Sequence, residues 1–208
     1  MAMRTNGLIG SMQHEERKEQ ISSVEPLENK EDKLLELYNK MIDIFTEGYM
    51  FHSEASLKSH VFGLQGFKRL HRFMSYKDRQ FVLKLQHYII DMYGIKLDID
   101  WKNLHIPEYD NVKDMFLSYL EYENHQYDKI SNIYKEMIDY GFIYDAKLIS
   151  ESLCNISKEI IKCRRYIQDF NSASWSWHHI RYIDIILHDK YKKEEAEEYN
   201  FHVQNCLQ

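Results

Sequence analysis

The stretch Leu64–Gly94, LQGFKRLHRFMSYKDRQFVLKLQHYIIDMYG, decides the fold of this chain. Apolar residues recur in it at steps of three and four, and charged residues lie between them; the apolar positions are Leu64, Phe67, Leu70, Phe73, Met74, Phe81, Val82, Leu85 and Ile89. This spacing predicts one two-faced helix of about eight turns. Gly94 is predicted to end it, because glycine readily adopts the left-handed conformation that closes many helices.

Patterns of the same kind on either side predict four more helices, at about 29–57, 110–141, 143–170 and 177–191. Only two prolines and seven glycines occur in 208 residues, which also favours a helical protein. The segment 95–110 contains Trp101 and Pro107 and reads as extended. Because an extended chain rises by more than 3 Å per residue, this segment can run the length of a bundle. The sequence therefore predicts an all-α four-helix bundle of two hairpins, with one long crossover and a short fifth helix.

The organisation along the chain follows from these patterns. Residues 1–29 are polar and lack sustained periodicity, so we expect a flexible N-terminal arm. Residues 30–191 are expected to form the bundle domain, and residues 192–208 a charged C-terminal tail. The fifth helix is unusually apolar, at Ile180, Ile183, Ile185, Ile186 and Leu187. An exposed apolar helix implies a partner subunit.

Composition limits the classes of function. The formal net charge of −6 gives no general attraction to nucleic acid or to anionic lipid. The three cysteines lack CxxC spacing and are expected to be reduced thiols. The sequence contains no signal-peptide core and no apolar run long enough to cross a membrane, so a cytoplasmic protein is expected.

Local motifs add a resemblance to a known family. Leu64-Gln65-Gly66-Phe67 at the start of the second helix and Leu120-Glu121-Tyr122-Glu123 in the third are similar to motifs of the eukaryotic ferritin heavy-chain family. The chain from about 29 to 191 resembles that family in helix lengths, crossover and fifth helix, and the two patterns overlay without a gap through the first four helices. The resemblance implies a cage built from copies of the chain or from other ferritin-like subunits, with iron as its cargo.

The resemblance also implies positions for a di-iron centre. Two Fe(II) ions need carboxylate and imidazole ligands that project inward from facing helices. The carboxylate positions fall on Asp43, Asp78 and Glu123, of which only Glu123 matches the family's residue. The family's histidine falls on Phe81, which has no lone pair to offer a metal, and its glutamine falls on Ser157. Asp43, Asp78 and Glu123 are therefore residual metal positions, or polar groups paired with Lys, Arg or Tyr, and the second interpretation is favoured.

Three functions stay open on these grounds. The first hypothesis is a ferritin-like cage subunit that contributes to intracellular iron storage without a competent ferroxidase centre of its own, so that iron has low occupancy at the bundle centre. The second is a slow ferroxidase that uses Asp43, Asp78 and Glu123. The third is a structural or interaction cage protein with no role in iron chemistry.

Overall fold

The computed structural model describes residues 27–97, 99 and 109–206. Five helices occur in these ranges: α2 (Leu27–Val61), α3 (Gln65–Tyr93), α4 (Val112–Asp139), α5 (Ile143–Ser172) and α6 (Trp177–Cys206). The chain divides into two compact units, Met1–Glu36 and Leu37–Gln208. In the first unit, the N-terminal part of α2 contains an ion pair of 3.2 Å between Lys33 Nζ and Glu36 Oε2.

The ends of the helices agree with the local signals in the sequence. Gly94 follows α3 in the left-handed conformation, with φ of 67°, as predicted. Asn111 caps α4, and its side chain accepts a hydrogen bond of 3.0 Å from the Asp114 N–H. Trp101 and Pro107 of the predicted crossover lie outside the described residues.

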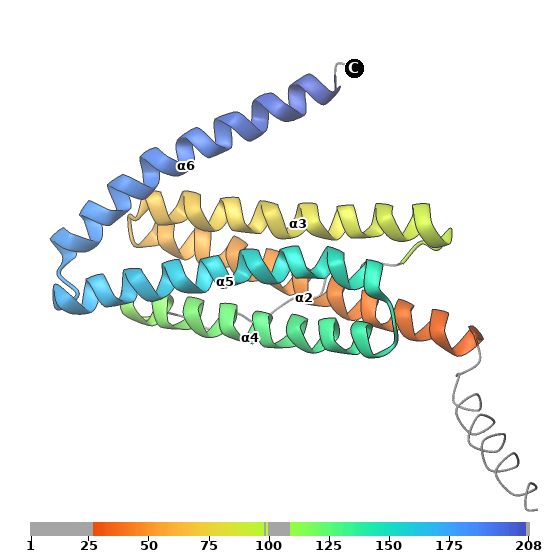
Figure 1. The fold of residues 1–208 in the computed structure, drawn as a ribbon. Coiled ribbons are helices and arrows are strands. Elements are labelled where there is room, and N and C mark those ends of the chain that lie inside the picture. The colour runs from red at the N-terminus through yellow and green to blue at the C-terminus, as the bar shows by residue number, and fades with distance from the viewer. Residues whose placement is uncertain (1–26, 98, 100–108, 207–208) are drawn as a thin grey trace, which may run out of the picture. The chain divides into compact units, whose positions relative to one another are not determined.

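The second unit is a bundle of α3, α4, α5 and the part of α2 from Leu37 onward, with α6 added to it (Figure 1). The helix α4 packs along α5, and α6 packs against α3. Two hydrogen bonds join α2 to α3: one links the Ser53 and Ser75 hydroxyl groups, and in the other the Ser56 hydroxyl donates to the Lys68 carbonyl. The predicted all-α bundle of two hairpins with a fifth C-terminal helix is confirmed.

The turn between α5 and α6 reverses the chain. Ser174 and Trp175 both take the left-handed conformation, with φ of 50° and 54°. The Trp175 N–H donates to the Phe170 carbonyl at 2.7 Å, and the Trp175 indole donates to Asn171 Oδ1 at 2.8 Å. These bonds hold residues that would otherwise avoid positive φ, and they direct α6 back along the bundle.

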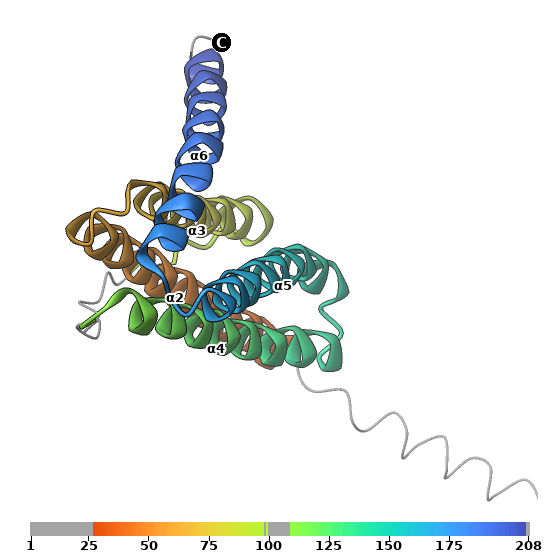
Figure 2. The ribbon, with the colours of Figure 1, turned by 90° about the vertical axis from the view of Figure 1, so that its left-hand side faces the viewer.

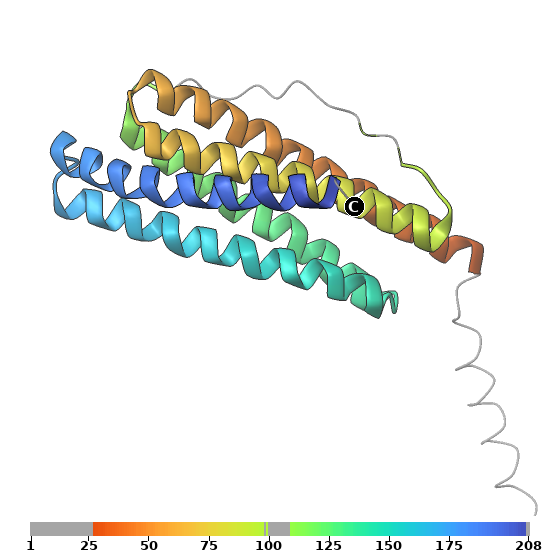
Figure 3. The same ribbon diagram turned by 90° about the horizontal axis from the view of Figure 1, so that it is seen from above.

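The helix α6 differs from the expected short helix in two respects. It runs to Cys206 rather than to about Tyr191, so most of the predicted tail 192–208 is helical. Figures 1 and 2 show its C-terminal part rising away from the bundle, and Figure 3 shows the same helix from above. One face of α6 is buried within the chain, at Ile180, Ile183, Leu187 and Tyr191, whereas Tyr182, Ile185 and Ile186 are exposed. Only part of the apolar surface of α6 is therefore free for a partner.

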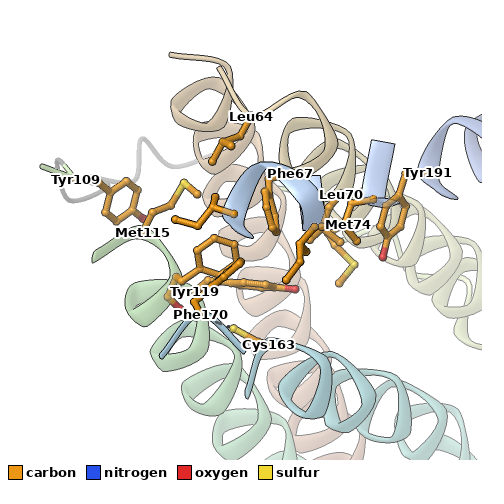
Figure 4. Packing of buried hydrophobic residues seen from close by; sticks show 14 of the residues in the cluster. Leu64, Phe67, Leu70, Met74, Tyr109, Met115, Tyr119, Cys163, Phe170 and Tyr191 are labelled. Carbon is orange, nitrogen blue, oxygen red and sulfur yellow. Dashed lines mark hydrogen bonds between the residues drawn. The ribbon is translucent and has the colours of Figure 1, made fainter. Parts of the chain in front are cut away.

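A cluster of buried side chains joins the N-terminal turns of α3 to α4, α5 and α6 (Figure 4). Phe67 lies at its centre, with ring centroids 4.7 Å from Phe116 and 6.2 Å from Phe170. Leu64, Leu70 and Phe116 are also fully buried. Full burial of side chains of this size stabilises by about 1.5–3 kcal/mol each, so this end of the bundle needs no bound group to hold it together. None of the helices described is long and apolar enough to span a membrane.

Candidate functional site

A cluster of ionisable side chains lies in the interior of the bundle. Its members are each less than 10% exposed and come from four helices: His52 of α2, His71 and Asp78 of α3, Glu123 of α4 and Glu159 of α5. Helical periodicity places them there, because each is three or four residues from an apolar residue on the inner face of its own helix. Burial of this many ionisable groups is costly unless they share protons or bind a cation.

His52 joins the two histidines to the carboxylates. His52 Nε2 lies 3.2 Å from Glu123 Oε1 and 4.0 Å from Asp78 Oδ2. Its other ring nitrogen, Nδ1, lies 3.2 Å from His71 Nδ1, so one of these two nitrogens carries a hydrogen and donates a hydrogen bond to the other. The His52 ring also meets the Tyr119 and Tyr122 rings edge to face. The position of the imidazole is thus fixed from three sides.

Burial controls the protonation of the cluster. Desolvation lowers the pKa of His52 to about 3, although the Glu159 carboxylate opposes the shift. Desolvation and the neighbouring His52 lower the pKa of His71 as well. Desolvation raises the pKa values of Asp78 and Glu123 well above their usual range, and each is raised further by a nearby carboxylate, Glu123 and Glu159 respectively. Burial therefore keeps the two histidines neutral at neutral pH, and it favours the protonated forms of Asp78 and Glu123.

Gly48 makes room for this arrangement. A Cβ atom at position 48 would lie 2.4 Å from Asp78 Oδ2 and 2.9 Å from the Tyr122 hydroxyl oxygen. Both distances are shorter than real carbon–oxygen contacts, so a side chain at this position would displace the Asp78 carboxyl group. The absent Cβ is what allows Asp78 to face the bundle centre from α3.

Several polar atoms of the cluster lack hydrogen bonds. Within the described part of the chain, Asp78 Oδ2, both carboxylate oxygens of Glu123, Glu159 Oε2 and the Tyr122 hydroxyl are buried without a hydrogen-bond partner. The contact of 3.2 Å between Glu123 and His52 brings the two atoms close but lacks hydrogen-bond geometry. Carboxylate oxygens and an imidazole nitrogen are donors that suit Fe(II). The donor types therefore fit iron, and unpartnered oxygens are available.

The spacing of these donors is less favourable than their chemistry. Among the residues that the structure describes, no three His, Cys, Asp or Glu side chains converge closely enough to hold a metal ion. Phe45 of α2 and Phe81 of α3 lie beside the cluster with ring centroids 4.1 Å apart. The two rings occupy space beside Asp78 and Glu123 that further ligands would need.

Two of the three residues proposed from the sequence meet in this site. Asp78 and Glu123 both lie beside His52. Asp43 is exposed on the outer face of α2 and does not reach the cluster. Phe45 and His52 of α2 face inward instead, and Phe45 lies two residues after Asp43. Since two residues turn a helix by about 200°, this small difference in register moves a side chain to the opposite face.

Three members of the cluster are not among the candidate site residues predicted from the sequence. They are His52, His71 and Glu159, all of which are buried. The sequence does contain a signal for them, because each is an ionisable residue on the apolar face of a helix. His71, for example, lies between the apolar residues Leu70 and Met74. Periodicity alone could not show that they meet, because they come from three helices whose rotation is set by packing.

No model of a protein family matches the sequence, and no curated protein matches it. Solved structures do match: an open-pore ferritin from the hyperthermophilic archaeon Archaeoglobus fulgidus superposes with a TM-score of 0.67 over 75% of this chain and 95% of that chain, at 15% identity. The fold is ferritin-like.

Other ferritins give the same result. A variant of PmFTN that was soaked in iron matches with a TM-score of 0.65 over 74% of this chain and 98% of that chain, at 14% identity. An engineered closed form of the Archaeoglobus fulgidus ferritin matches with a TM-score of 0.64. At these identities the likeness establishes the ferritin-like fold, and the chemistry of the site has to be argued from this chain's own residues.

Proposed function

We propose that this chain is a ferritin-like cage subunit that contributes to iron storage in the cytoplasm and lacks a competent ferroxidase centre of its own. It would assemble with copies of itself or with other ferritin-like subunits. The single observation that supports this proposal is the state of the bundle centre. A complete ferritin-like bundle surrounds a site in which the Phe45–Phe81 ring pair lies beside the cluster and Asp43 points outward.

Oxidation of Fe(II) by the pure protein tests the proposal. Metal-free full-length chain receives Fe(II) in air, and the formation of Fe(III) is followed against buffer and against Phe81→His. We expect the wild type to match buffer, because the donors at the cluster do not converge. The variant introduces an imidazole beside Asp78 and Glu123, and it should oxidise iron faster than the wild type. A wild-type rate well above that of buffer would contradict the proposal.

A slow ferroxidase is the second candidate function, and the unpartnered oxygens of Asp78, Glu123 and Glu159 favour it. These carboxylates and His52 Nε2 would hold iron as the substrate, with Glu159 in place of the expected Asp43. Bound iron would supply the redox chemistry, while His52 and His71 would keep the carboxylates oriented. Under this hypothesis Glu123→Gln should abolish the wild-type oxidation rate, whereas Asp43→Asn, on the outer face, should leave it unchanged.

Iron content distinguishes both candidates from a scaffold without iron chemistry. Protein isolated from its native source should contain iron if the chain belongs to a storage cage, whether or not it oxidises iron itself. A shell that is consistently free of iron would contradict both iron hypotheses and leave the structural one.

Assembly is a separate part of the proposal. The surface of α6 available for a partner is the face with Tyr182, Ile185 and Ile186, since Ile183 and Leu187 are buried in the chain itself. We expect the wild type to sediment as a large oligomer and Ile185→Lys with Ile186→Lys to give smaller species of normal helix content. Asp189→Lys, at an exposed position of the same helix, serves as the control. A wild type that is monomeric at micromolar concentration would contradict the cage.

A further inference from the structure

A cavity of about 400 Å³ opens between α3 and α5, over the buried cluster. Most of its exposed lining is apolar, and Phe45, Met74, Phe81 and Ile156 are its apolar side chains, beside polar and charged residues of the same helices. Cavities of this size with apolar walls and a few polar groups are typical of sites for small organic molecules. Neither of the two candidate functions explains the apolar walls, because iron needs only the carboxylates and the imidazole.

Four lysines surround this cavity. Lys77 and Lys84 belong to α3, and Lys158 and Lys162 belong to α5. Two of them have local partners: Lys162 Nζ donates to Glu159 Oε1 at 2.7 Å, and Lys77 Nζ lies 4.4 Å from the centre of the Phe73 ring. In the part of the chain that the structure describes, Lys84 and Lys158 are exposed and make no hydrogen bond or ion pair. Two uncompensated ammonium groups are thus available beside an apolar cavity.

The acidic side chains of the cavity do not cancel this positive charge. The residues that line the cavity include four lysines and three carboxyl groups, those of Asp78, Glu123 and Glu159, so the lining is net positive even when all three carboxyl groups are ionised. The Glu159 carboxylate is paired with Lys162. The field at the opening is therefore positive, although the chain as a whole carries a net charge of −6. An anion with an apolar body would be attracted there.

We propose that this cavity binds an amphiphilic monocarboxylate, such as a medium-chain fatty acid, with its hydrocarbon chain against Phe45, Phe81 and Ile156 and its carboxylate between Lys84 and Lys158. The apolar walls supply the hydrophobic contribution, and the two lysines supply the selectivity for an anionic head group. The proposal does not depend on iron and applies to the metal-free chain. It would give the protein a second ligand that competes for space with any ion at the cluster.

Calorimetric titration of the metal-free, full-length protein tests this inference with three probes of equal chain length: decanoate, decanol and decylamine. Decanoate is expected to bind once per chain, about five- to tenfold more tightly than decanol, as two exposed charge contacts would give. Added salt should weaken the binding of decanoate and leave that of decanol unchanged, because only the charged head is screened. Absence of decanoate binding, or equal affinity for decanol, would overturn the proposal. Tightest binding of decylamine would also overturn it, because the carboxylates would then control the site.

Two variants locate the head group. Lys84→Gln with Lys158→Gln should reduce the affinity for decanoate to that for decanol without changing the latter, and circular dichroism should show an unchanged helix content. Lys147→Gln, an exposed lysine of α5 outside the cavity, should bind decanoate as the wild type does. If Lys147→Gln lowers the affinity as much as the double substitution does, the binding reflects general surface charge and the cavity assignment is wrong.

Discussion

The carboxylate of Asp184 in α6 accepts a hydrogen bond of 2.7 Å from the backbone N–H of Gly66, in the first turn of α3. The next N–H, that of Phe67, donates to the same oxygen at 3.0 Å. Leu64, at the N-cap position of α3, offers no side-chain cap. A residue more than a hundred positions away therefore performs the role that a neighbouring Ser or Asp usually has, and it ties the fifth helix to the bundle.

Replacement of Asp184 should weaken this attachment. We expect Asp184→Ala to lower the free energy of unfolding by about 1–2 kcal/mol, because two buried N–H groups lose their acceptor. Asp184→Asn keeps an acceptor oxygen and should cost less. Urea denaturation measures both, and Asp189→Ala, an exposed neighbour, should be close to neutral. Equal effects at positions 184 and 189 would show that the cap contributes little.

Gly66 should tolerate no side chain. An added Cβ would lie 1.8 Å from the Asp184 carbonyl oxygen and 2.7 Å from the His188 backbone nitrogen, and neither backbone atom can move without the helix. We expect Gly66→Ala to cost at least about 3 kcal/mol and to separate α6 from α3. Hydrogen exchange should then show faster exchange in α6 and in the first turn of α3. His87→Ala, on an exposed face of the same helix, is the control; an unaltered exchange pattern in Gly66→Ala would contradict the close helix crossing.

The two rings beside the site should differ in their contribution to stability. Phe45 is only 4% exposed, so Phe45→Ala is expected to cost about 3–5 kcal/mol. Phe81 is partly exposed, so Phe81→Ala should cost less, about 1–3 kcal/mol. Chemical denaturation of both variants gives the comparison. The reverse order would mean that Phe81 fills the core more completely than its exposure indicates.

The buried histidines make stability depend on pH. Since burial lowers the pKa of His52 from 6.5 to about 3, the unfolded chain takes up a proton between these values while the folded chain does not, and stability falls as the pH falls through this window. The slope is about 1.4 kcal/mol per pH unit for one such group. Asp78 and Glu123 act in the opposite direction, because their raised pKa values make stability fall as the pH rises above about 4.

Comparison with His52→Gln isolates the histidine. Between about pH 6 and pH 4, the stability of the wild type should fall relative to the variant by about 1 kcal/mol or more per pH unit. Denaturation in a series of buffers measures this difference, and His87→Gln, at an exposed position, should show none. A constant difference across this range would mean that His52 is not buried in its neutral form.

A second polar cluster should contribute more to the free energy of unfolding as a whole than any one of its hydrogen bonds does. Asp145 Oδ1 accepts from the hydroxyl groups of Tyr38, of Tyr93 at 2.9 Å and of Tyr88 at 3.2 Å. Tyr38→Phe should cost about 1 kcal/mol, while Asp145→Ala should cost about 2–4 kcal/mol because all three hydroxyls lose their acceptor. Combination of the two changes should be less than additive, and strict additivity in the double-mutant cycle would show that the residues act independently.

The sequence by itself determined the elements of this protein. The periodicity of Leu64–Gly94 and the left-handed Gly94 are local properties, and each appears in the structure where the sequence predicts it. Asp78 and Glu123, whose positions at the bundle centre the family resemblance implied, are buried at inward-facing positions of their own helices. The first two features depend on neighbours within a few residues along the chain, so they can be predicted without knowledge of the fold.

Only the tertiary structure decided how the helices are rotated and what they meet. It placed His52, rather than Asp43, beside Glu123, and it brought His71 and Glu159 into the same cluster. It also turned Ile183 and Leu187 onto α3 and left Ile185 and Ile186 exposed. The physical reason is that a rotation of one residue changes the direction of a side chain by about 100°, and this rotation is set by close packing, such as that of Gly66 against Asp184, between segments far apart in the sequence.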